Sequence, residues 1–104
     1  KFMHIVNLFG MWFEWHDDKF DLVNIKRGYT LEEIASVFDD DYAVTVFDPR
    51  HYDDNEQRLL TTGTSSQFRL VTVAWVERDE VARVITAFKP SVDQKKRYNY
   101  AKRQ

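Results

Sequence analysis

Three arginines in the second half of the chain are spaced so that they could bind an anionic substrate. Arg58, Arg69 and Arg83 fall in three successive segments that we expect to be strands. In an antiparallel meander such residues can line up across one face of the sheet. A guanidinium keeps its charge and donates paired hydrogen bonds, which suits phosphate oxygens. Alternatively, these arginines are structural and pair with nearby glutamates such as Glu56 and Glu77 on a solvated face.

Two more side chains could transfer a proton near these arginines. His51 lies in a polar loop, and an imidazole exchanges protons near neutral pH. Glu56 could act as a base if it lies close to Arg58. Each has a structural alternative, because aspartates in the loop could hold His51 and a cross-strand salt bridge could occupy Glu56. Nothing nearby supplies a second nitrogen ligand, so we expect neither a metal site nor a cofactor.

Positive charge continues beyond the three arginines. Arg78 lies in a tight reversal, Lys89 follows the last expected strand, and a basic segment holds Lys95, Lys96 and Arg97. These cations could contact phosphates, and each such contact would make binding sensitive to salt. The basic segment could equally be the solvated face of a helix whose Tyr98 packs on the sheet.

The elements that must position these residues predict an α+β fold. Thr30 and Glu33 form a capping box before an apolar stripe, which predicts a helix. Short turns between successive strands favour an antiparallel meander. We therefore expect two N-terminal helices, a four-stranded antiparallel sheet and a C-terminal helix. The helices are expected at 17–27, with His16 at the helix start, and at 31–38 and 91–102. The strands are expected at 43–47, 57–62, 70–76 and 81–88, with turns at 63–66 and 77–80. A strand-like lead-in at 12–15 precedes the first helix.

Composition limits the possible functions. The chain has 104 residues, 43% of them hydrophobic, which suits one domain with one core. It has no cysteine, which excludes disulfides and thiolate chemistry and suits a reducing compartment, so we expect a cytoplasmic protein. Residues 1–10 are too short and polar for a membrane span. We interpret them as a leader or an expression remnant, followed by a single domain at 11–104. No Gly-rich phosphate loop or nucleophile elbow indicates a small-molecule enzyme.

Charge is divided unevenly along the chain. Residues 1–60 carry 13 Asp/Glu and 6 Lys/Arg, whereas residues 61–104 carry 4 Asp/Glu and 9 Lys/Arg. Such a division predicts a basic surface for a polyanion or an acidic partner. The alternative is that the charges interleave on the folded surface.

Several motifs taken in order resemble one known family. They are Phe13-Glu14-Trp15-His16-Asp17, then Asn24, Lys26 and Gly28, Val37-Phe38-Asp39, Asp48-Pro49, Glu56-Gln57-Arg58, Gly63, Arg69-Leu70-Val71, Glu77-Arg78 and Arg83-Val84-Ile85-Thr86-Ala87. Over roughly residues 12–100 the chain resembles the BrnT family, toxins of type II toxin–antitoxin pairs with a RelE-like ribonuclease fold. It departs from the family pattern at Phe88, where arginine is typical, and at His16 and Arg27, where aspartate and histidine are commoner.

The resemblance implies a metal-independent endoribonuclease that inhibits translation. Its partners would be RNA and a cognate BrnA-like antitoxin of the ribbon-helix-helix type, usually in a heterotetramer. With this resemblance, the candidate catalytic residues are Glu56, Arg58, Arg69, Arg83 and His51, with Glu56 a possible base for the 2′-hydroxyl. The candidate RNA-binding residues are Arg78, Lys89, Lys95, Lys96 and Arg97. The alternative is a non-catalytic RNA- or antitoxin-binding module of the same fold, in which Phe88 has removed a needed arginine.

Overall fold

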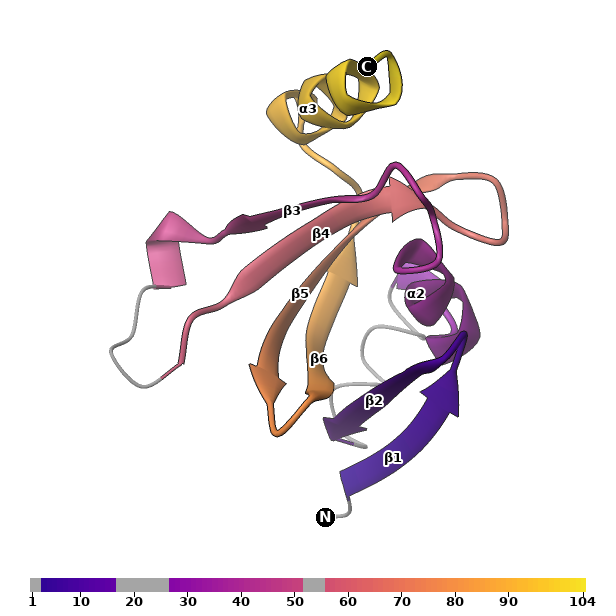
Figure 1. Ribbon diagram of the computed structural model, residues 1–104, viewed down its shortest axis with the longest axis vertical. Coiled ribbons are helices and arrows are strands. Elements are labelled where there is room, and N and C mark those ends of the chain that lie inside the picture. Colours follow the sequence, from indigo (N-terminus) through magenta and orange to yellow (C-terminus); the bar gives the residue numbers. More distant parts are fainter. Residues whose placement is uncertain (1–2, 17–26, 52–55) are drawn as a thin grey trace.

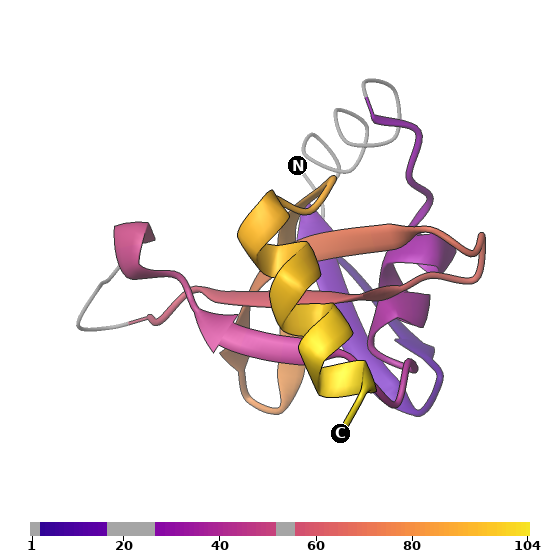
Figure 2. The ribbon, with the colours of Figure 1, turned by 90° about the horizontal axis from the view of Figure 1, so that it is seen from above.

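One mixed β-sheet organises the chain. The computed structural model describes residues 3–16, 27–51 and 56–104. The sheet order is β1-β2-β6-β5-β4-β3. Figure 1 shows the sheet curving around α2, with α3 on the other side of β3 and β4, and Figure 2 gives the view from above. The strands are β1 (Met3–Leu8), β2 (Met11–His16), β3 (Val44–Phe47), β4 (Leu59–Thr64), β5 (Leu70–Arg78) and β6 (Val81–Phe88), and the helices of the described residues are α2 (Leu31–Val37) and α3 (Val92–Lys102), with a 3-10 turn at Pro49–His51.

The α+β class is confirmed, but the expected four-stranded antiparallel sheet is wrong. Residues 3–8, set apart above as a leader, form β1 and pair with β2, so the sheet has six strands. Strand β2 runs parallel to β6, with Glu14 opposite Arg83. A parallel pair needs a long connection, and here residues 17–80 lie between the two strands, which a pattern of short turns does not indicate. The helix expected at 17–27 lies outside the described residues, apart from Arg27.

The face of the sheet that packs on α2 holds the core. Phe13, Val71 and Val73 are fully buried there, together with Ile34 of α2. Phe38, at the end of α2, meets Phe13 and Trp75 edge to face, with ring centroids 5.2 and 5.3 Å away. Such pairs stabilise beyond the area they bury. The apolar stripe expected in residues 31–38 is therefore confirmed, and it fixes the sheet's curvature around α2.

The opposite face, called the α3 face below, carries Leu60, Thr72, Val76, Arg83 and Phe88. Alternation along β6 would place residues 83 and 88 on opposite faces. However, Thr86 pairs with Ala74 while Val84 pairs with Trp75, so Ile85 is an extra residue in a β-bulge. A bulge resets the alternation, and Phe88 therefore points to the same face as Arg83.

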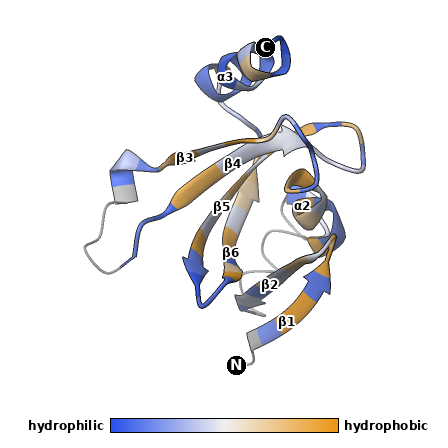
Figure 3. Ribbon diagram, in the orientation of Figure 1, coloured by the Kyte–Doolittle hydropathy of each residue, from blue (hydrophilic) through white to orange (hydrophobic). Residues whose placement is uncertain are grey.

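Helix α3 is held on this face by a few polar contacts. Ser91 and Gln94 form a full capping box at its start. Tyr98 is buried, donates to Asp40 Oδ2 over 2.6 Å and lies 2.9 Å from Thr64 Oγ1. The rest of α3 is mostly hydrophilic, as Figure 3 shows. The expected helix 91–102 is confirmed, and Tyr98 packs on the sheet as one of the two alternatives had it. No helix in the described ranges is long and apolar enough to cross a membrane.

The turn expected at 63–66 falls later in the chain. Gly63 lies inside β4, where a Cβ would come within 3.0 Å of the Val37 carbonyl oxygen. The glycine therefore serves close packing of the strand on α2 and not a reversal. The chain turns after Ser65, whose N–H donates to the Arg69 carbonyl over 2.9 Å. The reversal expected at 77–80 is confirmed in position.

Candidate functional site

A row of charged side chains crosses the α3 face at the far end of the sheet from the β4–β5 turn. Arg83 is opposite Val76 on one side and Glu14 on the other. Arg58, next to β4, lines the same shallow pocket as Val76 and Arg83. Two of the three arginines that were expected to line up, Arg58 and Arg83, therefore lie together at one pocket. We call the set Glu14, His16, Glu56, Arg58, Arg78 and Arg83 the basic row.

His16 is a member of the basic row that the sequence pattern did not reveal. Arg83 Nη2 donates to His16 Nε2 over 2.9 Å, and Arg83 Nε lies 3.8 Å from Glu14 Oε1. Because a guanidinium only donates, Nε2 must carry its lone pair here, so the neutral ring is protonated at Nδ1. His16 ends β2, and because residues 17–26 lie outside the described part of the chain, its expected place at a helix start stays a prediction. The signal that could have found it is the alternation of Trp12, Glu14 and His16, which sends every second side chain of β2 to one face.

Glu56 lies in the same pocket but is engaged by Arg78. The Arg78 guanidinium donates to both carboxylate oxygens, with Nη2 to Oε1 at 2.7 Å. These hydrogen bonds from Arg78 hold the pKa of Glu56 below its ordinary value. The Glu56 carboxylate therefore stays ionised and orients Arg78. Arg58, in contrast, has no ion-pair partner among the described residues. Its guanidinium can bind an incoming anion.

Arg69 does not join this row, which corrects the expectation that three arginines line up. It precedes β5 at the end next to the β4–β5 turn, whereas Arg83 is level with Val76, roughly 20 Å along the strand. There its guanidinium makes a bidentate pair with Glu33, with both N–O distances 2.6 Å. Arg78 is the arginine that β5 contributes to the basic row.

The Glu33 pair also modifies the predicted capping box. Thr30 accepts from the Glu33 N–H over 3.1 Å as expected, but the Glu33 carboxylate turns to Arg69 and Ser65 and does not return to Thr30. Hydrogen bonds from Arg69 lower the pKa of Glu33, whose side chain is only 3% exposed. A buried carboxylate needs such a partner, so in this structure Arg69 ties the β4–β5 turn to α2.

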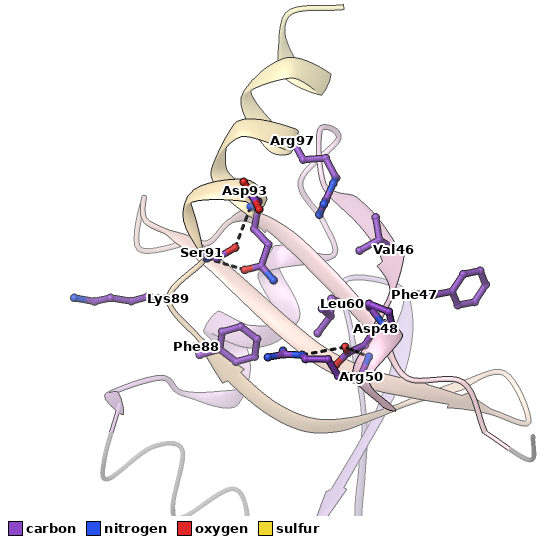
Figure 4. A pocket seen from close by; sticks show the side chains of 12 residues that line it. Val46, Phe47, Asp48, Arg50, Leu60, Phe88, Lys89, Ser91, Asp93 and Arg97 are labelled. Carbon is purple, nitrogen blue, oxygen red and sulfur yellow. Dashed lines mark hydrogen bonds and ion pairs between the residues drawn. The ribbon is translucent and has the colours of Figure 1, made fainter. Parts of the chain in front are cut away.

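A second pocket lies on the α3 face between β3, β4 and the start of α3. Phe88 and Leu60 form its apolar side, and Arg50 and Arg97 lie at its rim. Figure 4 shows Arg50 extending toward the side of Phe88, while Lys89 points away. Lys89 is exposed and follows the end of β6, so it does not replace an arginine at position 88 on this face.

The remaining candidates are scattered. Lys95 and Lys96 are exposed on α3, away from its buried Tyr98. His51 ends the 3-10 turn, and its side chain lies outside the described part of the structure.

The basic row therefore brings two guanidiniums, Arg58 and Arg83, together with the imidazole of His16 in one pocket. A family model described as "Ribonuclease toxin, BrnT, of type II toxin-antitoxin system" matches residues 15–91, well over half of the chain. The matched segment runs from the end of β2 to the N-cap of α3 and includes every member of the basic row except Glu14. No curated protein matches the chain.

Proposed function

This chain belongs to the BrnT family, the ribonuclease toxins of type II toxin–antitoxin systems, and we propose that it cleaves RNA at the basic row without a metal ion. The observation that carries the proposal is the Arg83–His16 contact of 2.9 Å beside Arg58. It brings a fixed cation and a proton acceptor within one pocket, as phosphodiester cleavage needs.

The proposed reaction begins when RNA displaces His16 from Arg83. A phosphate oxygen is a stronger acceptor for a guanidinium than an imidazole is. Arg83 and Arg58 bind the scissile phosphate, and the freed Nε2 of His16 takes the proton of the 2′-hydroxyl. The 2′-oxygen attacks phosphorus as the bond to the 5′-oxygen breaks, and the 5′-oxygen takes a proton from water. The products are a 2′,3′-cyclic phosphate and a 5′-hydroxyl end.

The other candidate residues receive different roles in this proposal. Glu56 is a weak base because Arg78 lowers its pKa, so it positions Arg78 and does not remove a proton. Arg69 is a structural residue because it is engaged by the buried Glu33. Lys95, Lys96 and Arg97 contribute positive charge that attracts the RNA backbone. His51 stays a candidate for a second proton transfer.

A type II toxin has a cognate antitoxin, and we place this partner over the basic row. Covering Arg58 and Arg83 with acidic side chains would block RNA binding directly, since both ligands are anionic. We further propose that the antitoxin is BrnA-like, with a ribbon-helix-helix dimer that brings two toxin chains into a heterotetramer, and that cleavage of cellular RNA inhibits translation.

The test is cleavage of RNA by purified, antitoxin-free protein in excess EDTA. Wild type should cut an oligoribonucleotide and leave intact one with a 2′-deoxy sugar at the cut site. Arg83→Ala and His16→Ala should each lose about 10²–10³-fold in rate, as removal of one preorganised donor or general base does. Arg103→Ala, at the exposed C-terminus, is the matched control and should cleave normally. Activity that vanishes in EDTA and returns with a divalent metal would refute the metal-independent reaction.

Phe88 supports a second candidate, a non-catalytic module of the same fold. The family's typical arginine is absent at a position that shares a face with Arg83. Expression of the chain alone in bacteria separates the two functions. Growth arrest with RNA loss that disappears in an Arg58→Ala, Arg83→Ala double variant supports the ribonuclease, whereas healthy growth with intact RNA supports the module.

A further inference from the structure

The pocket that contains Phe88 has the features of a site for one nucleotide. Its lining combines an aromatic ring, two aliphatic side chains and two arginines: Phe88, Val46, Leu60, Arg50 and Arg97. Single-stranded RNA is bound by this combination, because a base stacks on an aromatic ring while cations hold its phosphates. We propose that this pocket binds a nucleotide of the RNA substrate next to the one that is cut. The inference rests on the proposed RNA cleavage and adds a subsite to it.

The side chain of Phe88 lies at the pocket with part of its surface exposed. The bulge at Ile85 turns Phe88 to the α3 face, opposite Thr72 in the sheet. Thr72 is fully buried and is capped by Gln94, to which its hydroxyl donates over 3.0 Å. The ring is only half-buried, whereas the core phenylalanine Phe13 is 0% exposed. Phe88 therefore is not needed to close the core, and part of its surface is open to the pocket.

Polar groups around the ring are ready for a base and a phosphate. The Gln94 Oε1 atom already accepts from Thr72 and from the Ser91 N–H, and within the described residues its Nε2 has no acceptor. That amide is free to donate to a base edge. The Arg50 guanidinium Nε lies 3.5 Å from Asp48 Oδ1, and the Arg50 side chain is 76% exposed. Arg97 is exposed on α3, so both guanidiniums can reach a phosphate.

The position relative to the basic row makes this a neighbouring subsite. Val84, Ile85, Thr86 and Ala87 separate Phe88 from the level of Arg83, which is roughly 15 Å along the strand. Both residues point to the α3 face, so one RNA strand laid across that face can reach both. Arg50 and Arg97 offset the charges of Asp48 and Asp93 at the pocket, and Lys89, which points away from it, adds one positive charge nearby. With so few unbalanced cations, the pocket is poorly suited to an acidic peptide, whereas the aromatic ring of Phe88 favours a nucleotide base.

The experiment measures binding apart from cleavage. A fluorescent oligoribonucleotide with 2′-O-methyl sugars cannot be cut, because the attacking hydroxyl is blocked, and its anisotropy reports the Kd. Phe88→Ala should weaken binding about 5- to 100-fold, as removal of the stacking surface for one base does. Phe88→Leu keeps an apolar side chain without a ring and should weaken binding similarly, whereas Phe88→Tyr should bind like wild type. Phe9→Ala, an exposed ring in the β1–β2 turn, is the matched control and should change nothing.

The arginines give a separate readout. Arg50→Ala and Arg97→Ala should each lower the slope of log Kd against log salt, by about 0.7 for each phosphate of the single strand that the guanidinium binds. If Phe88→Leu binds like wild type, or if Phe88 variants lose affinity for the antitoxin but not for RNA, the subsite is refuted while the ribonuclease stands. If wild type neither binds nor cuts RNA, the proposed function fails and this inference fails with it.

Discussion

Replacing Arg69 by alanine should unfold this protein more easily without removing its chemistry. Arg69 donates to both oxygens of Glu33, to the Gly28 carbonyl over 3.0 Å, and its guanidinium lies 4.6 Å from the centre of the Tyr29 ring. The variant leaves a buried carboxylate with a hydrogen bond from Ser65 alone. This perturbation separates a structural arginine from a catalytic one, which the sequence pattern could not do.

The magnitude follows from the burial of the pair. Breaking a fully buried ion pair by removing one partner costs about 3–5 kcal/mol. The Arg69 side chain is 44% exposed, so water screens the pair and we reduce the expected cost to about 2–3 kcal/mol. For a domain of this size each kcal/mol shifts Tm by about 4–8 °C, which predicts a fall of roughly 8–24 °C. Thermal unfolding followed by circular dichroism measures it.

Two comparisons make the result decisive. The double variant Glu33→Gln, Arg69→Ala should lose less stability than Arg69→Ala, because the amide leaves no buried charge. At a temperature where Arg69→Ala is folded, it should cleave RNA within about threefold of wild type, whereas Arg83→Ala should be folded but inactive. An Arg69→Ala protein with a normal Tm and no cleavage would refute the reasoning and return Arg69 to the catalytic set.

Three further predictions concern other positions. Arg69 holds the pKa of Glu33 below its ordinary value of 4.5, so the pair stabilises the fold fully above that pH and loses its contribution as pH falls through the folded pKa. The fall of Tm with decreasing pH should therefore be smaller in Glu33→Gln than in wild type. Phe88→Arg adds a cation on the face of Arg83 and should raise RNA cleavage if wild-type cleavage is weak; an unchanged rate in an initial-velocity assay would contradict this. Asp79 and Glu80 both have positive φ, 51° and 65°, in the β5–β6 turn. Glu80→Gly should therefore raise the free energy of unfolding by about 1 kcal/mol in urea titrations, and a loss of stability would argue against strain there.

Local signals in the sequence determined most individual elements. The apolar stripe of residues 31–38, the strand expected at 81–88 and the helix expected at 91–102 all correspond to elements of the structure. These features depend on residues close in the chain, whose periodicity reports directly on burial.

The structure alone decided which charged residues meet. Glu33 has the position of a capping-box glutamate, yet its carboxylate serves Arg69, 36 residues away. His16 joins Arg83, 67 residues away, because β2 and β6 pair in parallel. A single extra residue, Ile85, turns Phe88 onto the face of Arg83. The uneven charge along the chain thus identified residues 61–104 as the basic part of the sequence. Long-range pairing and one bulge decided which of its arginines share a pocket, because contacts between distant strands leave no periodic trace in the sequence.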